Sequence, residues 1–277
     1  MLTNAYCTLA DYKNYVVARG QSSSTDATDD GVIQDLINSA SRYIDTQSGR
    51  QFYPRIEEQL YNIPSDRHLY LDDDLLAVIT FSNGDDAAIS ANQYVTQGAK
   101  PPFWAISLRK TSTVTWEPNS AGDSEQVIGV LGIWGRHDNY TQRAWLKVGT
   151  LGAAMSDTTT LAFTMTAGHS IAVGNILRID NELFNVSTVA TNTITPIVRG
   201  DNGSTAATHL ISAPVYAWQP MEGAKQSALE IVNSAYKKRF GQSVGESATV
   251  TAAGVVLSPR DIPATAQAFI DSQAFLV

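Results

Sequence analysis

The chain has 277 residues, more than the roughly 100 to 150 residues of the commonest domain size, which favours two structural units. Its formal net charge of −8 argues against a nonspecific nucleic-acid-binding protein, because such proteins need clustered lysine and arginine. No run of about 18 apolar residues predicts a membrane span, and the single cysteine, Cys7, excludes an internal disulfide.

Two helices are predicted at the start of the chain. Thr8 and Asp11 have the spacing of a helix N-cap, a hydroxyl followed three residues later by a carboxylate. A second helix is predicted between Asp29 and Gly49, where apolar residues recur every three or four positions. The Ser- and Thr-rich stretch between the two is typical of a connection.

From Gln51 to Gly135 the pattern changes to the alternation of β-strands. The predicted strands are Glu57 to Ile63, His68 to Leu71, Val78 to Ser82, Gln93 to Thr96, Trp104 to Leu108, Thr113 to Trp116 and Val127 to Trp134. Turn and breaker residues, such as Asn83-Gly84 and Pro101-Pro102, separate them. We expect a small antiparallel sheet.

Between about Val148 and Trp218, short and evenly spaced strands predict a compact all-β barrel or sandwich. These strands are expected at Thr160 to Met165, Ile176 to Ile179, Glu182 to Val189, Thr193 to Ile197 and Val215 to Trp218. A long helix with basic residues Lys237 to Arg239 in its last turn follows, and a short helix is expected from Asp261. Because the β segment separates a sheet from its expected helical cover, we interpret it as an insertion.

The expected fold class is therefore α+β, a helical body with a small antiparallel sheet, interrupted by an all-β barrel or sandwich. The predicted units are residues 1–147 for the N-terminal part of the body, 148–218 for the inserted β domain and 219–277 for the C-terminal helix and tail. The last helix has too little sequence around it to bury its own apolar face, so we expect it to dock on a partner. The candidate partner-docking residues are Pro259, Ile262, Phe269, Ile270, Phe275 and Leu276.

Few residues point to catalysis. The four histidines, His68, His137, His169 and His209, lack the three- or four-residue spacing of metal ligands, and each is expected on the surface or in a turn. Cys7 has no nearby His and Asp and is expected to be a partly buried thiol. Phosphate-binding glycine loops and nucleophile-elbow motifs are missing from the sequence. We therefore predict a protein that is not an enzyme, with no catalytic residue, metal site or cofactor.

Three further patterns have a structural interpretation that we favour over a functional one. Asp72-Asp73-Asp74 is followed by two leucines rather than the ligands of a calcium loop, and is expected to be a solvated strand end. Arg199-Gly200-Asp201 spells an adhesion tripeptide, although the same residues suit an exposed hairpin turn. Phe103, Trp104 and Trp116 could form a carbohydrate- or base-stacking platform, but core and interface packing is favoured.

An ordered set of segments runs through both parts of the expected body. It comprises Leu9 to Lys13, Asp35 to Asp45, Gly49 to Pro54, Leu69 to Asp72, Val78 to Thr80, Ile128 to Gly135 and Pro220 to Phe240. In this order the segments resemble the head-to-tail connector (adaptor) proteins of long-tailed bacteriophages. Val198 to Ala207, followed by His209, is similar to a strand–turn pattern in small β domains of phage structural proteins. The insertion of about 70 residues departs from the short chains of the family.

The resemblance implies a non-enzymatic structural protein of the virion neck, assembled in the host cytoplasm. Its expected partners are further copies in a ring, a dodecamer by analogy with the family, together with the portal protein and a tail terminator or stopper protein. Genome DNA would pass through the lumen without specific binding, consistent with the charge of −8.

Two alternatives belong to other functional classes. One is a virion decoration or receptor- or carbohydrate-binding module that acts through the inserted β domain. The other is a tail-associated peptidoglycan hydrolase, which would need a carboxylate pair or metal site in a cleft that the sequence does not show.

Overall fold

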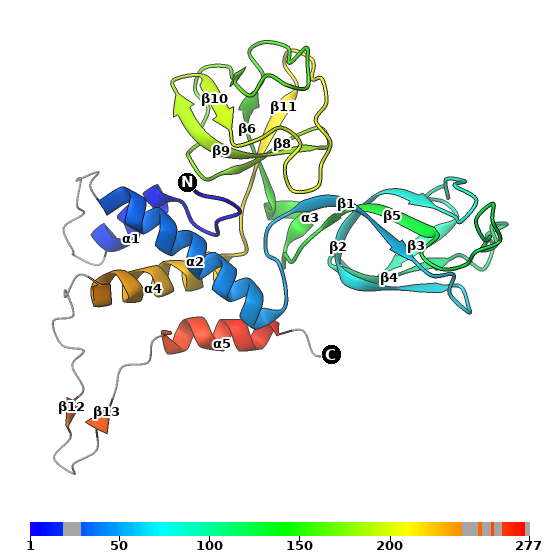
Figure 1. Cartoon of the computed structure of the whole chain (residues 1–277), viewed down its shortest axis with the longest axis horizontal. Coiled ribbons are helices and arrows are strands. Elements are labelled where there is room, and N and C mark those ends of the chain that lie inside the picture. The colour runs from blue at the N-terminus through cyan, green and yellow to red at the C-terminus, as the bar shows by residue number, and fades with distance from the viewer. Residues whose placement is uncertain (19–28, 240–248, 251–255, 258–261, 275–277) are drawn as a thin grey trace.

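A computed structural model describes residues 1–18, 29–239, 249–250, 256–257 and 262–274 (Figure 1). The described chain is mostly β, with antiparallel sheets of five and six strands beside a layer of helices. The expected helical connector body is therefore wrong. Helical periodicity identified real helices, but the two sheets include strands, such as Trp145–Thr150, that the sequence pattern did not predict.

The helical layer contains α1 (Leu9–Ala18), α2 (Asp30–Ser48), α4 (Glu222–Arg239) and α5 (Ala264–Gln273). The predicted cap of α1 is confirmed, since the Thr8 backbone N–H donates to Asp11 at 2.8 Å and the Asp11 N–H donates to the Thr8 hydroxyl at 3.0 Å. Gly49 ends α2 in the left-handed conformation, with φ of 66°, as its sequence position predicts. Apolar side chains of all four helices share one core with Leu2, Tyr6 and Phe52.

The five-stranded sheet consists of β1 (Arg55–Tyr61), β2 (His68–Ser82), β3 (Tyr94–Gln97), β4 (Phe103–Leu108) and β5 (Ile128–Trp134), in the order β1-β5-β2-β4-β3. β2 runs without a break through Asp72 to Asp74, where the sequence predicted two strands and a solvated end. Arg55 pairs with Asp73 and Arg50 pairs with Asp74, so neutralised carboxylates lie inside the strand. Thr113 to Trp116 forms no strand, but Trp116 packs on Phe81 at 6.0 Å between ring centroids.

The six-stranded sheet follows the short helix α3 (Tyr140–Arg143). Its strands are β6 (Trp145–Thr150), β7 (Phe163–Thr164), β8 (Ile176–Ile179), β9 (Glu182–Ala190), β10 (Thr193–Pro196) and β11 (Pro214–Trp218). The order is β6-β11-β8-β9-β10-β7, and a bridge between Leu151 and Met165 joins the two ends, so the sheet closes as a barrel. The chain enters and leaves the barrel side by side, with Trp145 paired to Trp218.

An apolar cluster joins the two sheets. Ile56, Leu76 and Ile133 of the five-stranded sheet pack with Leu183 and Trp218 of the barrel. The Trp218 indole also donates to the Phe52 carbonyl at 3.1 Å, next to the helical core. The barrel thus shares buried contacts with both other parts of the molecule. A small pair of strands, β12 (Thr249–Val250) and β13 (Val256–Leu257), lies apart from them in Figure 1.

Candidate functional site

Glu182, at the start of β9, has a completely buried carboxylate. It accepts five hydrogen bonds: from Nε and Nη2 of Arg199 at 2.8 and 3.0 Å, from the backbone N–H groups of Gly200 and Ala207 at 2.9 Å, and from Nε2 of His209 at 2.8 Å. Burial raises the pKa of Glu182, but the hydrogen bonds from His209, Arg199 and the backbone outweigh it and lower this pKa to about 2. The carboxylate is ionised and saturated with donors.

His209 lies between two carboxylates. Its Nδ1 is 2.8 Å from Asp180 and its Nε2 is 2.8 Å from Glu182. Donation from both ring nitrogens satisfies both carboxylates, so this geometry favours the imidazolium form of His209. Burial lowers its pKa, yet the hydrogen bonds to Glu182 and Asp180 are stronger and the net shift is upward.

The loop that contains Arg199-Gly200-Asp201 continues from this cluster to the rest of the molecule. Asn202 donates to Asn4 at 2.8 Å and to the carbonyl of Pro54 at 3.1 Å, and its own carbonyl accepts from the Ile56 N–H at 3.0 Å. Asn185 of the barrel donates to Asn4 at 2.9 Å. We call these contacts, together with the Glu182 cluster that holds the loop, the joint.

The joint corrects the expectation of an exposed hairpin turn. The Arg199 side chain is only 4% exposed, because its guanidinium lies on Glu182 and also donates to the Ala207 carbonyl at 2.6 Å. Asp201 accepts from Asn185 at 2.8 Å. The residues that spell an adhesion tripeptide therefore hold the loop within the barrel, and the next residue, Asn202, makes the contacts to the body.

Each histidine was expected on the surface or in a turn, and the structure shows that two of the four, His137 and His209, are buried, each 3% exposed. His137 donates from Nε2 to the Gln219 carbonyl at 3.1 Å and accepts the Asn139 N–H at Nδ1, which fixes a neutral ring. Burial lowers the pKa of His137. It packs edge-on against Trp218 at 5.3 Å, so its role is in packing.

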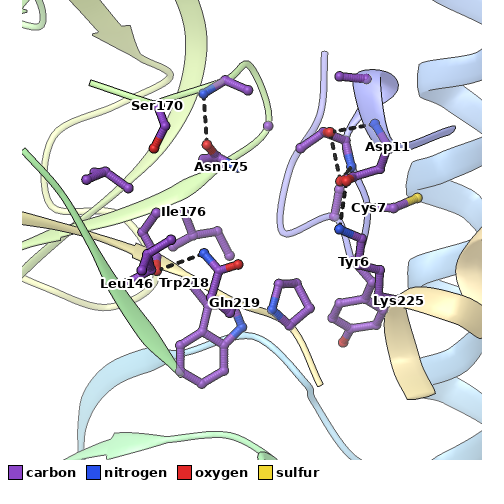
Figure 2. Close-up of a pocket in the computed structure, with 18 residues that line it drawn as sticks. Tyr6, Cys7, Asp11, Leu146, Ser170, Asn175, Ile176, Trp218, Gln219 and Lys225 are labelled. Carbon is purple, nitrogen blue, oxygen red and sulfur yellow. Dashed lines mark hydrogen bonds and ion pairs between the residues drawn. The ribbon is translucent and has the colours of Figure 1, made fainter. Parts of the chain in front are cut away.

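A cavity of about 270 Å³ lies beside the joint, between the start of α1 and the barrel (Figure 2). Asp11 and Cys7 line one wall and Asn175 faces them from the barrel, with Gln219 below. The Lys225 ammonium is paired with Asp11 at 2.6 Å. Cys7 is buried more fully than the partly buried thiol that was predicted, and burial raises its pKa to about 12. The Cys7 sulfur points away from the cavity toward the helices (Figure 2), so this wall presents a compensated ion pair.

A second groove of about 370 Å³ shares Leu146, Gln219 and Pro220 with this cavity and extends it toward α3. Arg143 and Trp145 line it, and the Leu146 side chain is 54% exposed. Both hollows flank the place where the chain leaves the barrel and enters α4.

The predicted docking residues lie elsewhere, on or near α5. Ile270 is 1% exposed in the helical core, and Phe269 packs on Phe52 at 5.7 Å between ring centroids. Ile262 is partly buried against the same core. The helix therefore buries its apolar face within its own chain, because α2 and α4 cover it. Pro259, Phe275 and Leu276 lie outside the described residues, and the docking role of the set stays a prediction.

The joint itself was missed by sequence reasoning. The sequence pattern from Arg199 to His209 indicated a turn. It gave no sign of the contact with Asn4, which lies 198 residues from Asn202. Glu182, a carboxylate next to the apolar residues of a predicted strand, was the available signal for a buried ion pair.

No family model, curated protein or solved structure matches the chain. In the described ranges, no group of three His, Cys, Asp or Glu side chains is placed to hold a metal ion. None of the helices in this part of the chain is long and apolar enough to span a membrane.

Proposed function

We propose that the chain is a structural protein of a bacteriophage virion, an adaptor that forms a ring between the portal vertex of the head and the tail or the next head-completion protein. It acts by holding other proteins in place. The body that performs this role is mostly β, with the barrel as a fixed part of it.

The observation that carries the proposal is that the buried charges of Glu182 and Arg199 are fully occupied by hydrogen bonds within the chain. Glu182 and Arg199 would be reactive if a substrate could displace one of their partners, but five donors occupy the Glu182 carboxylate. The Arg199 guanidinium is in turn held by Glu182 and by backbone carbonyls, including those of Asp157 and Thr160 at 3.1 Å. These groups stabilise a loop that joins two parts of the chain, which fits a structural role for them.

The sequence resemblance supplies the particular role. Within the described residues, the segments that carry it contribute to α1, α2, β2, β5 and α4, on both sides of the barrel in the sequence. The barrel begins and ends at the paired residues Trp145 and Trp218, so it interrupts the body at one place. An insertion at one place leaves the contacts between the helices and the five-stranded sheet intact and adds a second β unit to the adaptor.

Binding to the portal protein of the same virus tests this role. The full chain should co-sediment with purified portal rings and should not bind empty capsids that lack a portal, or host cells. Binding to capsids or cells without portal binding would contradict the adaptor role and favour a decoration or receptor-binding protein. Asn202→Ala, which weakens the joint, and Asn192→Ala, whose side chain lies outside it, form a matched pair for asking whether portal binding needs the attached barrel.

A further inference from the structure

Three cations near the entrance of the barrel lack a carboxylate partner in the described chain. Arg143 ends α3, Lys147 lies in β6 and Arg178 lies in β8, and Arg143 and Lys147 are exposed. Arg178 donates to uncharged acceptors in its own turn, the Asp180 carbonyl at 2.6 Å and the Asn181 amide at 3.2 Å. Other arginines of this acidic chain, such as Arg55, are paired with carboxylates.

The three cations lie among aromatic side chains. Tyr216 of β11 is directly opposite Lys147 on one neighbouring strand and Arg178 on the other, so the three side chains form one row across the barrel. The Arg178 guanidinium lies 5.7 Å from the Trp145 ring, and Trp145 shares the 370 Å³ groove with Arg143. We call Arg143, Trp145, Lys147, Arg178 and Tyr216 the cationic surface.

The carboxylates of Asp138 and Glu222 also line the groove, but neither forms an ion pair with Arg143. Asp180, beside Arg178, has its carboxylate on His209. The cationic surface therefore has charge available for an acidic partner.

A second exposed surface has the opposite charge. Tyr70 of β2 and Trp104 of β4 are 62% and 55% exposed, and their rings stack with centroids 5.9 Å apart and planes 23° apart. Phe103 and Trp116 pack against the core, as one part of the predicted core and interface packing, whereas the interface part of that prediction stays untested for the exposed Trp104. Asp72, two residues after Tyr70, is exposed and has no cationic partner within the described ranges. We call Tyr70, Asp72 and Trp104 the acidic surface.

We propose that copies of the chain join head to tail, with the acidic surface of one copy docked on the cationic surface of the next. This inference rests on the proposed ring. A closed ring needs two different, complementary patches on each copy, and these two patches are complementary in charge. Both are rich in Tyr, Trp or Arg, the residues that dominate the energetics of protein interfaces. The net charge of −8 makes another copy a suitable acidic partner.

The proposed contact is tested on portal rings by reversing the charge of each surface in turn and then combining the two reversals. Asp72→Lys alone and Lys147→Glu alone each place like charges in every contact, and each should raise the protein concentration for half-maximal ring assembly at least about tenfold. An equimolar mixture of the two variants should restore assembly. In the mixture, contacts between the two introduced side chains alternate with contacts between the native Asp72 and Lys147, and both kinds of contact join opposite charges. The double variant in one chain should also assemble. Lys110→Glu, the same change at an exposed residue outside both surfaces, is the matched control.

Copies bound per portal, counted by negative-stain electron microscopy, decide the outcome. Single variants that assemble like wild type, or a mixture that does not regain assembly, would overturn the proposed contact. If wild-type chains bind the portal without touching each other, the contact fails while the adaptor role stands. If they do not bind the portal, the adaptor role itself fails. Lys147-dependent binding of a DNA duplex at about 0.15 M salt, without an effect on assembly, would assign the cationic surface to nucleic acid instead.

Discussion

Asn4 and Asn202 exchange side-chain hydrogen bonds, each donating from Nδ2 to Oδ1 of the other at 2.8 Å, across 198 residues of sequence. This pair fastens the N-terminal segment to the barrel loop, and the Pro54 carbonyl accepts from the same Asn202 amide at 3.1 Å. Three parts of the molecule therefore meet at one side chain.

Asn202→Ala should destabilise the protein by about 1–3 kcal/mol, because it removes the partner of the Asn4 Nδ2 and of the Pro54 carbonyl. The change is measured from urea unfolding monitored by tryptophan fluorescence. Asn192→Ala, at a residue whose side chain makes no hydrogen bond in the described chain, should change stability by less than about 0.5 kcal/mol. Equal effects of the two substitutions would contradict the importance of the joint.

Gly203 provides a test that depends on backbone shape. It has φ of +79°, and a Cβ at this position would lie 2.8 Å from the Ile56 carbonyl of β1. Gly168 has a similar φ of +86° with open space around it. Both substitutions to alanine pay for the left-handed conformation, but only Gly203→Ala also forces the loop away from the sheet. We expect Gly203→Ala to lower the melting temperature by several degrees more than Gly168→Ala, roughly the effect of 1–2 kcal/mol. A smaller effect at Gly203 would argue that the loop is not held against β1.

Glu182→Gln should be among the most damaging single substitutions, because it leaves the buried Arg199 guanidinium without its counter-charge. Removal of one partner from a buried ion pair typically costs about 3–5 kcal/mol. Glu117→Gln, which changes an exposed carboxylate, is the control. Thermal unfolding followed by circular dichroism measures both, and a loss below about 1 kcal/mol for Glu182→Gln would show that the cluster contributes little.

The same cluster predicts a pH profile with two slopes. The pKa of Glu182 is lowered from 4.5 to about 2, so its contribution to stability is complete above about pH 4.5 and is lost as the pH falls toward 2. The pKa of His209 is raised, so its contribution is complete below about pH 6.5 and is lost as the pH rises through the raised value. Urea midpoints from pH 3 to 9 measure both slopes. His209→Asn should flatten the alkaline slope and also reduce the acidic slope, because the hydrogen bond from His209 helps to lower the pKa of Glu182; an unchanged alkaline slope would mean that His209 is not the titrating group.

Local signals were sufficient for the helices. Thr8 and Asp11 form the predicted cap, and α2 extends between the acidic start and Gly49 as its periodicity indicates. β6 was missed because Trp145 to Thr150 mixes apolar and polar residues without clear alternation. It is a strand because β11 pairs with it.

The larger errors came from contacts between distant residues. Three consecutive aspartates favour a solvated end by local rules, yet Arg50 and Arg55 reach Asp74 and Asp73 from other segments and keep β2 continuous. The residues from Arg199 to Asp201 have a sequence typical of a turn, but burial of this turn depends on the distant residues Glu182 and Asn4. Because local sequence patterns do not reveal such pairings between distant residues, the sequence predicted a mainly helical body instead of two sheets.

The proposed function requires that this chain forms a ring on a portal vertex. Electron micrographs of purified portal rings incubated with excess chain test it most directly. We expect class averages with an added ring of copies on one face of the portal, with the same rotational symmetry in every particle. Portal rings that stay bare at saturating concentrations of the chain would contradict it.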